Sequence, residues 1–157
     1  CGYAPAGAES SSVQVVPAVT VASTGMITIV SGTNPDNNDA IEFGTVAAGS
    51  TTNKAIVLAI SANSGWNLQV SKNQDLTDGG YVTVPSGNLK FTSSGPVGPT
   101  YVTSPAEFGT VTTPTTVTSS DDPASAANIS IGYSLNVPAS QPVGYYTAFH
   151  TYTLVVT

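Results

Sequence analysis

The sequence has little charge. Of its 157 residues only 8% are charged, and these are nine acidic residues and three lysines, with no arginine. The net charge is −6 and the isoelectric point is near 4.1. Soluble domains average about a quarter charged residues. An acidic chain without arginine lacks the basic surface that binds nucleic-acid phosphates, so we predict no nucleic-acid partner.

Long apolar runs are absent as well. No run approaches the roughly 18 residues that a membrane-spanning helix needs, so the sequence predicts no transmembrane segment. Hydrophobic residues nevertheless make up 40% of the chain, which is too many for a disordered tail. Ser and Thr account for 41 of the 157 residues. Hydroxyl groups therefore replace charges on the surface of what we predict to be one domain with a real core.

Residues suited to catalysis are scarce. The chain has one His and one Cys, so it can form no internal disulfide and lacks the three or four ligands of a structural zinc site. A Cys–His nucleophilic pair would have to combine Cys1 with His150, and nothing in the context of Cys1 supports that pairing. We predict that the protein is not an enzyme.

Oxygen-bearing side chains gather in one predicted turn. Asp36, Asp39 and Glu42 lie close together in the sequence, and calcium takes about six to eight oxygen ligands. Their spacing does not match an EF-hand. Asn and Asp are also ordinary turn residues, because their side chains bond to their own backbone. The three residues are a candidate calcium site, and the sequence suggests no other cofactor.

The sequence begins at Cys1 rather than Met. We expect a mature chain produced by signal-peptide cleavage, and hence an extracellular or cell-surface location. A Cys at this position resembles the lipid-bearing residue of bacterial lipoproteins, which makes Cys1 a candidate lipid anchor. The alternative is an ordinary cleavage site that happens to leave Cys. Asn128 begins an Asn-Ile-Ser sequon and is a candidate glycosylation site.

Apolar residues alternate with small or polar ones through most of the chain. Residues 129–137 place a bulky apolar side chain at every odd position, and residues 56–60 and 66–70 do so at even positions. The C-terminal run 144–156 places on one side Tyr146, Ala148, His150, Tyr152, Leu154 and Val156. This is the period of a strand with one buried face, and clusters of Gly, Pro, Asn and Asp separate the segments. We predict an all-β, antiparallel sandwich, Ig-like or jelly-roll-like. The predicted core includes Trp66, Leu68, Tyr133, Leu135, Tyr152 and Leu154.

The N-terminal segment carries its own apolar row. Its members fall on odd positions: Val13, Val15, Pro17, Val19, Val21, Ile27 and Ile29. Pro17 cannot donate to a ladder, which favours an edge strand. The row is either the first strand of its own sandwich or a strand that completes the sheet of a neighbouring subunit. Such head-to-tail donation does not close and gives a filament. We divide the chain into a leader and donor strand, 1–31, and a sandwich domain, 32–157.

Short motifs near the middle and the end of the chain resemble a known family. Residues 66–68, Trp-Asn-Leu, and residues 152–154, Tyr-Thr-Leu, resemble the two motifs of WxL-type domains. Those are β-sandwich domains of bacterial surface proteins associated with cell walls. Tyr152 stands where the family has its second Trp. The layout is also similar to that of strand-donating filament subunits, such as TasA-like fibres and archaeal bundling pilins.

Two functions are consistent with these features. The first is the structural subunit of an extracellular filament or pilus, assembled with copies of itself by N-terminal donor-strand complementation and serving adhesion, cell–cell contact or biofilm formation. The second, implied by the WxL resemblance, is a monomeric, surface-anchored module that binds cell wall or glycan. In that case residues 13–30 pack within their own chain.

Overall fold

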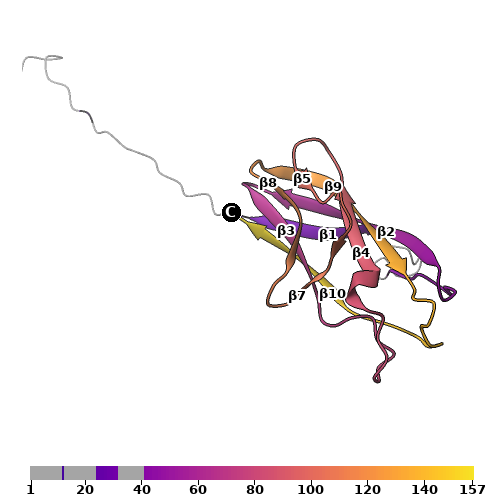
Figure 1. Cartoon of the computed structure of the whole chain (residues 1–157). Coiled ribbons are helices and arrows are strands. Elements are labelled where there is room, and N and C mark those ends of the chain that lie inside the picture. Colours follow the sequence, from indigo (N-terminus) through magenta and orange to yellow (C-terminus); the bar gives the residue numbers. More distant parts are fainter. Residues whose placement is uncertain (1–11, 13–23, 32–40) are drawn as a thin grey trace, which may run out of the picture.

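The computed structural model describes residues 12, 24–31 and 41–157. These residues form two β-sheets packed against each other (Figure 1), which confirms the predicted all-β sandwich. The only helical element among them is the 3-10 turn η1 (Ser86–Asn88). No helix in the described part of the chain is long and apolar enough to cross a membrane.

The first sheet contains five antiparallel strands. Their order across the sheet is β1 (Gly25–Ser31), β2 (Thr51–Ala62), β9 (Ala124–Asn136), β4 (Leu89–Ser94) and β6 (Ala106–Glu107). The two long strands β2 and β9 lie at its centre. Their apolar residues directly face one another in the register, as in the pair Leu58 and Ile129, and so present one continuous apolar face.

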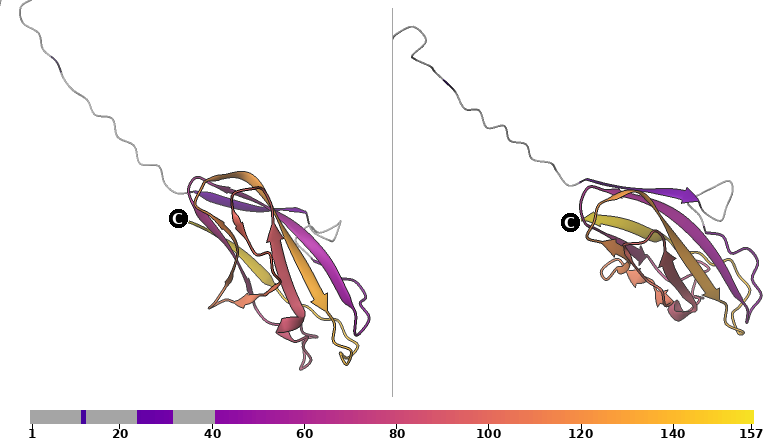
Figure 2. Two further views of the ribbon diagram at one scale, coloured as in Figure 1. Left: turned by 45° about the horizontal axis from the view of Figure 1, so that its top comes forward. Right: turned by 90° about the horizontal axis from the view of Figure 1, so that it is seen from above.

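The second sheet covers that face. Its order is β10 (His150–Val156), β3 (Trp66–Lys72), β8 (Thr115–Ser120) and β5 (Thr100–Tyr101), and the short strand β7 (Gly109–Thr110) pairs in parallel with the end of β3. The edge strands β1 and β10, one from each sheet, run along the same side of the sandwich (Figures 1 and 2).

The core lies between the two central strand pairs. Trp66, Leu68, Tyr133 and Leu135 are all buried in it. The other two predicted core residues, on β10, are half-buried and pack against this cluster. The difference follows from topology, because an edge strand has a neighbour on only one side.

The structure changes the predicted division of the N-terminal segment. β1 pairs with β2 of its own chain, with Ile27 opposite Ile60 and Ile29 opposite Leu58. The sandwich therefore includes residues 25–31, which the predicted division groups with the leader. The rest of the predicted polymerisation strand lies outside the described residues: Val13, Val15, Pro17, Val19 and Val21.

Candidate functional site

The side of the sandwich formed by β1 and β10 is incompletely covered. On β10, the side chains of Tyr152, Leu154 and Val156 lie opposite the buried residues of β3. All three are only half-buried. Ile29 on β1 also belongs to the inner face, opposite Leu58, yet it is 43% exposed. Core-facing apolar surface thus remains in contact with solvent along this side.

The two edge strands touch at one end only. A Cβ atom placed on Gly25, the first residue of β1, would collide with the side chain of Val156 and lie in tight contact with that of Leu154. From this contact beside the C-terminus, β1 and β10 diverge along their lengths (Figures 1 and 2). The absence of a side chain at Gly25 lets the strands approach there, and their divergence explains why the side chains further along stay half-exposed.

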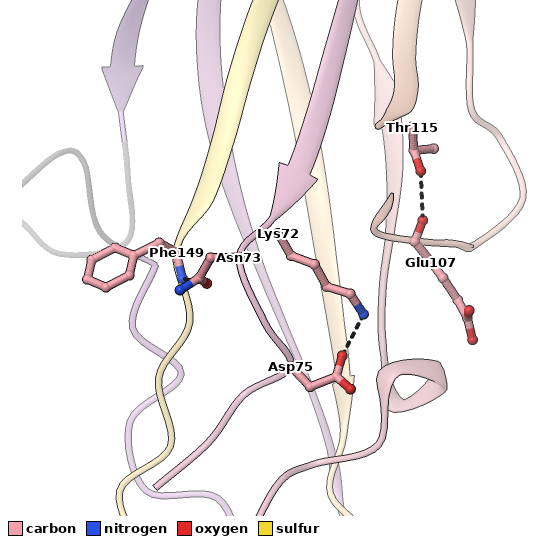
Figure 3. A network of polar contacts seen from close by, with 6 residues as sticks. All are labelled: Lys72, Asn73, Asp75, Glu107, Thr115 and Phe149. Atoms are coloured by element: carbon pink, nitrogen blue, oxygen red, sulfur yellow. Dashed lines mark hydrogen bonds and ion pairs between the residues drawn. The ribbon is translucent and has the colours of Figure 1, made fainter. Parts of the chain in front are cut away.

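The hydrogen bonds at the two ends of β10 show which of its backbone N–H and C=O groups point away from β3. The Asn73 N–H donates to the Phe149 carbonyl over 3.0 Å, and the Thr157 N–H donates to the Gly65 carbonyl over 2.8 Å. Figure 3 shows Asn73 beside Phe149, whose N–H donates to the Asn73 Oδ1. Antiparallel partners bond at alternate residues. Odd-numbered residues of β10 therefore bond to β3.

The even-numbered residues of β10 direct their N–H and C=O groups the other way. These are the same residues whose side chains face the core, Tyr152 and Leu154 among them. Among the described residues no strand pairs with β10 on that side. The open edge therefore combines unpaired backbone groups with partly exposed apolar side chains, which is the surface that an added strand requires.

A polar cluster, buried at Tyr133 and part-buried at His150 and Tyr152, ties the two sheets together close to this edge. The Tyr133 hydroxyl of β9 lies 3.0 Å from Nδ1 of His150 and 2.7 Å from the hydroxyl of Tyr152, both on β10. Burial raises the pKa of both tyrosines. Burial, and secondly the charge of Lys72, lowers the pKa of His150 to about 4. All three residues are therefore neutral at pH 7 and act as hydrogen-bonding groups.

Aromatic rings surround His150 and leave little space beside it. The ring of Phe108 lies 4.2 Å from the imidazole and 4.9 Å from the ring of Tyr133. The adjacent cavity has a volume of about 10 Å³, which is about the space that one water needs. Lys72 lines it and pairs with Asp75 (Figure 3). This cluster has the form of a structural cross-link, since a cavity of that size has no room for a substrate.

Of the candidate calcium, glycosylation and lipid-anchor residues, the structure describes only Glu42 and Asn128. Asp36 and Asp39 of the candidate calcium site lie outside the described residues, and Glu42 is exposed. Within the described ranges no three acidic, His or Cys residues gather closely enough to hold a metal ion. Asn128 is exposed on β9, opposite Ala59. Cys1 lies outside the described residues.

Phe108 was not singled out as a site residue from the sequence. It is buried between β6 and β7 and carries the ring contacts to His150. Its signal is a repetition, because Glu-Phe-Gly-Thr-Val occurs at 42–46 and again at 107–111. Phe43, the equivalent residue in the first copy, is partly buried and also packs against the core.

Several large aromatic side chains stay on the surface. Tyr81 and Tyr145 are almost fully exposed, and their loops are joined by backbone hydrogen bonds between Thr77 and Thr147. Phe149 is also exposed, and its ring points away from the sandwich in Figure 3. Aromatic surface is therefore present at the end of the sandwich where β10 begins.

No protein-family model matches the sequence, and no curated protein matches it either. The inference of function therefore rests on the residues themselves.

Proposed function

We propose that this protein is the structural subunit of an extracellular filament, in which the N-terminal segment of one subunit completes the sandwich of the next. The observation that carries the proposal is the incompletely covered side formed by β1 and β10. The same chain supplies an apolar row at 13–21 with the period of a strand. A half-covered core edge and an apolar row with the period of a strand are complementary.

Hydrophobic burial provides the driving force for this assembly. Fully burying one Val side chain contributes about 1.5–3 kcal/mol. A strand laid along β10 also removes Tyr152, Leu154 and Ile29 from water, since these core-facing side chains are now partly exposed. Both the donated strand and the accepting edge therefore gain from the contact.

The scarcity of charge suits close packing of subunits. The outer face of the second sheet carries Asn67, Gln69, Thr151 and Thr153, with no Lys or acidic residue among the outward positions of its two longest strands. Contacts over such a face desolvate hydroxyls and amides instead of ammonium groups, which are costly to bury. Each subunit both gives and accepts a strand, so the contact is head-to-tail and the assembly is open-ended.

Removal of the N-terminal segment tests the proposal. A variant lacking residues 1–23 retains all of β1 and should stay folded, because every described strand is intact. It should form no filaments under negative-stain microscopy, whereas a variant lacking only residues 1–11 should form them. Filaments of normal appearance from the 1–23 deletion would contradict the proposal.

A monomeric, glycan- or wall-binding module is the second candidate function. The observation in its favour is the exposed pair Tyr81 and Tyr145 on adjoining loops, because exposed aromatic rings are common in recognition surfaces. This candidate requires the full-length chain to remain a monomer in size-exclusion chromatography and to be retained by peptidoglycan. Filament formation by the full-length chain excludes it.

A further inference from the structure

The geometry of β10 restricts the direction in which a donated strand can run. In a strand, side chains and backbone groups alternate with the same period of two residues. All core-facing residues therefore direct their N–H and C=O groups to one side. On β10 that side is the open edge. A strand added there must offer its own bonding groups at matching positions.

The β10–β3 pair illustrates the antiparallel rule. Two hydrogen bonds flank this pair, one at Phe149 and one at Thr157. On both strands they involve the register positions that alternate with the core-facing residues. An antiparallel pair thus bonds through residues of the same face, whereas a parallel pair bonds core-facing residues of one strand to outward-facing residues of the other. At the open edge β10 bonds through core-facing residues. A parallel partner would therefore bond through its outward-facing residues.

Pro17 distinguishes between these two arrangements. It belongs to the apolar odd-numbered row. If that row packs on the core beside β10, the Pro17 side chain faces the core with it. In an antiparallel strand its nitrogen would point at β10 and leave a backbone carbonyl of β10 without a donor. In a parallel strand the nitrogen points away from β10. Proline is tolerated in a strand where its nitrogen is not needed for the ladder.

From these observations we infer that residues 13–21 of one subunit add to the open edge of β10 in a second copy, parallel to β10. This inference rests on the proposed function. The odd-numbered residues cover the side chains of Tyr152 and Leu154 where these are partly exposed. The even-numbered residues Gln14, Val16, Ala18 and Thr20 bond to the β10 backbone. At about 3.3 Å per residue, residues 13–21 are long enough to cover all of β10.

The hydrogen bonds of Thr24 favour a second copy as the acceptor. Its N–H donates to Oδ1 of Asn63 over 2.8 Å, and its carbonyl accepts from the Asn63 N–H over 3.2 Å. These bonds hold Thr24 in line with β1, at the end where β1 meets the C-terminal end of β10. A parallel strand on the β10 of its own chain would have to reverse direction and also pass from one sheet to the other within residues 22–23, whereas a strand donated to a second copy needs no such turn.

Two matched proline substitutions test the direction. Val15→Pro and Val16→Pro make the same chemical change at adjacent residues, but only residue 16 directs its N–H at a parallel β10. We expect Val16→Pro to lower the sedimentable filament fraction at least ten-fold relative to Val15→Pro. Loss of packing alone predicts the reverse, since residue 15 faces the core. The reverse result would overturn the parallel assignment.

A second pair tests whether β10 is the acceptor. Leu154→Pro and Leu154→Ala both remove the leucine side chain, but only the proline removes an N–H that points to the open edge. The ladder to β3 does not use that N–H. With both variants folded by circular dichroism, we expect filaments from Leu154→Ala and none from Leu154→Pro.

Equal polymerisation of the two Leu154 variants would show that another edge accepts the segment. The proposed function is judged separately by the deletion of residues 1–23. If that deletion abolishes filaments while the two variants of each matched pair give equal filament fractions, the filament proposal stands and the assignment to β10 fails. If the full-length chain is a monomer, both fail.

Discussion

The Tyr133 hydroxyl joins the first sheet to β10 through polar side chains. It contacts both His150 and Tyr152 on β10, and burial holds all three residues in their neutral forms. A buried hydroxyl is stabilising only while its partners are satisfied. This cluster therefore fixes β10, the proposed acceptor strand, against the opposite sheet.

Tyr133→Phe should destabilise the fold without emptying the core. The substitution keeps the ring but leaves the His150 Nδ1 and the Tyr152 hydroxyl without this partner. We expect the free energy of unfolding in urea to fall by about 1–3 kcal/mol. Tyr81→Phe removes a hydroxyl from an exposed side chain and serves as the control, with an expected change within about 0.5 kcal/mol. Equal effects would argue against a stabilising role for the cluster.

His150 should make stability depend on pH in a defined window. Its pKa falls from 6.5 to about 4 on folding, through burial and then Lys72. Above pH 6.5 both states carry neutral imidazole. As the pH falls from 6.5 towards 4, only the unfolded chain takes up the proton, so the free energy of unfolding falls by about 1.4 kcal/mol per pH unit. Unfolding in urea at several pH values measures this slope.

His150→Gln separates this effect from the titration of carboxylates. The variant lacks the imidazole, so the slope between pH 6.5 and 5 should disappear, while the loss of stability near pH 4 and below persists. Identical slopes in the two proteins would show that His150 is not the responsible group.

At the scale of elements, alternation in the sequence predicts which face of each long strand is buried. The apolar positions of residues 56–60, 66–70 and 129–137 are the core-facing positions of β2, β3 and β9. The two-residue strands β5, β6 and β7 are too short to show a period in the sequence. Their pairing depends on the neighbouring strands.

A periodic pattern specifies a face but not a partner. Ile27 and Ile29 share the parity of the residues before them, and the sequence alone does not show that they pair with β2 of the same chain. Likewise Tyr152 and Leu154 are core-facing as predicted, but only the strand order shows that β10 is an edge. The open edge of the candidate site is therefore a consequence of topology, while its apolar character is present in the sequence.

At the scale of the whole molecule, charge and topology favour the same kind of assembly. The chain carries only three lysines, and two of them, Lys54 and Lys90, lie on the first sheet, away from the proposed acceptor edge. Parallel addition at β10 would convert an incomplete sandwich into one with a fully covered core. Each subunit would then depend on its neighbour for one strand.

Residue-resolved hydrogen exchange tests this account most directly. In the isolated subunit that lacks residues 1–23, the N–H groups of Thr153 and Val155 should be protected by β3. Those of Tyr152 and Leu154 should exchange rapidly, because they point to the open edge. In filaments of the full-length chain, all four should be protected. Rapid exchange at Tyr152 and Leu154 in filaments, or protection of both in the isolated subunit, would contradict the account.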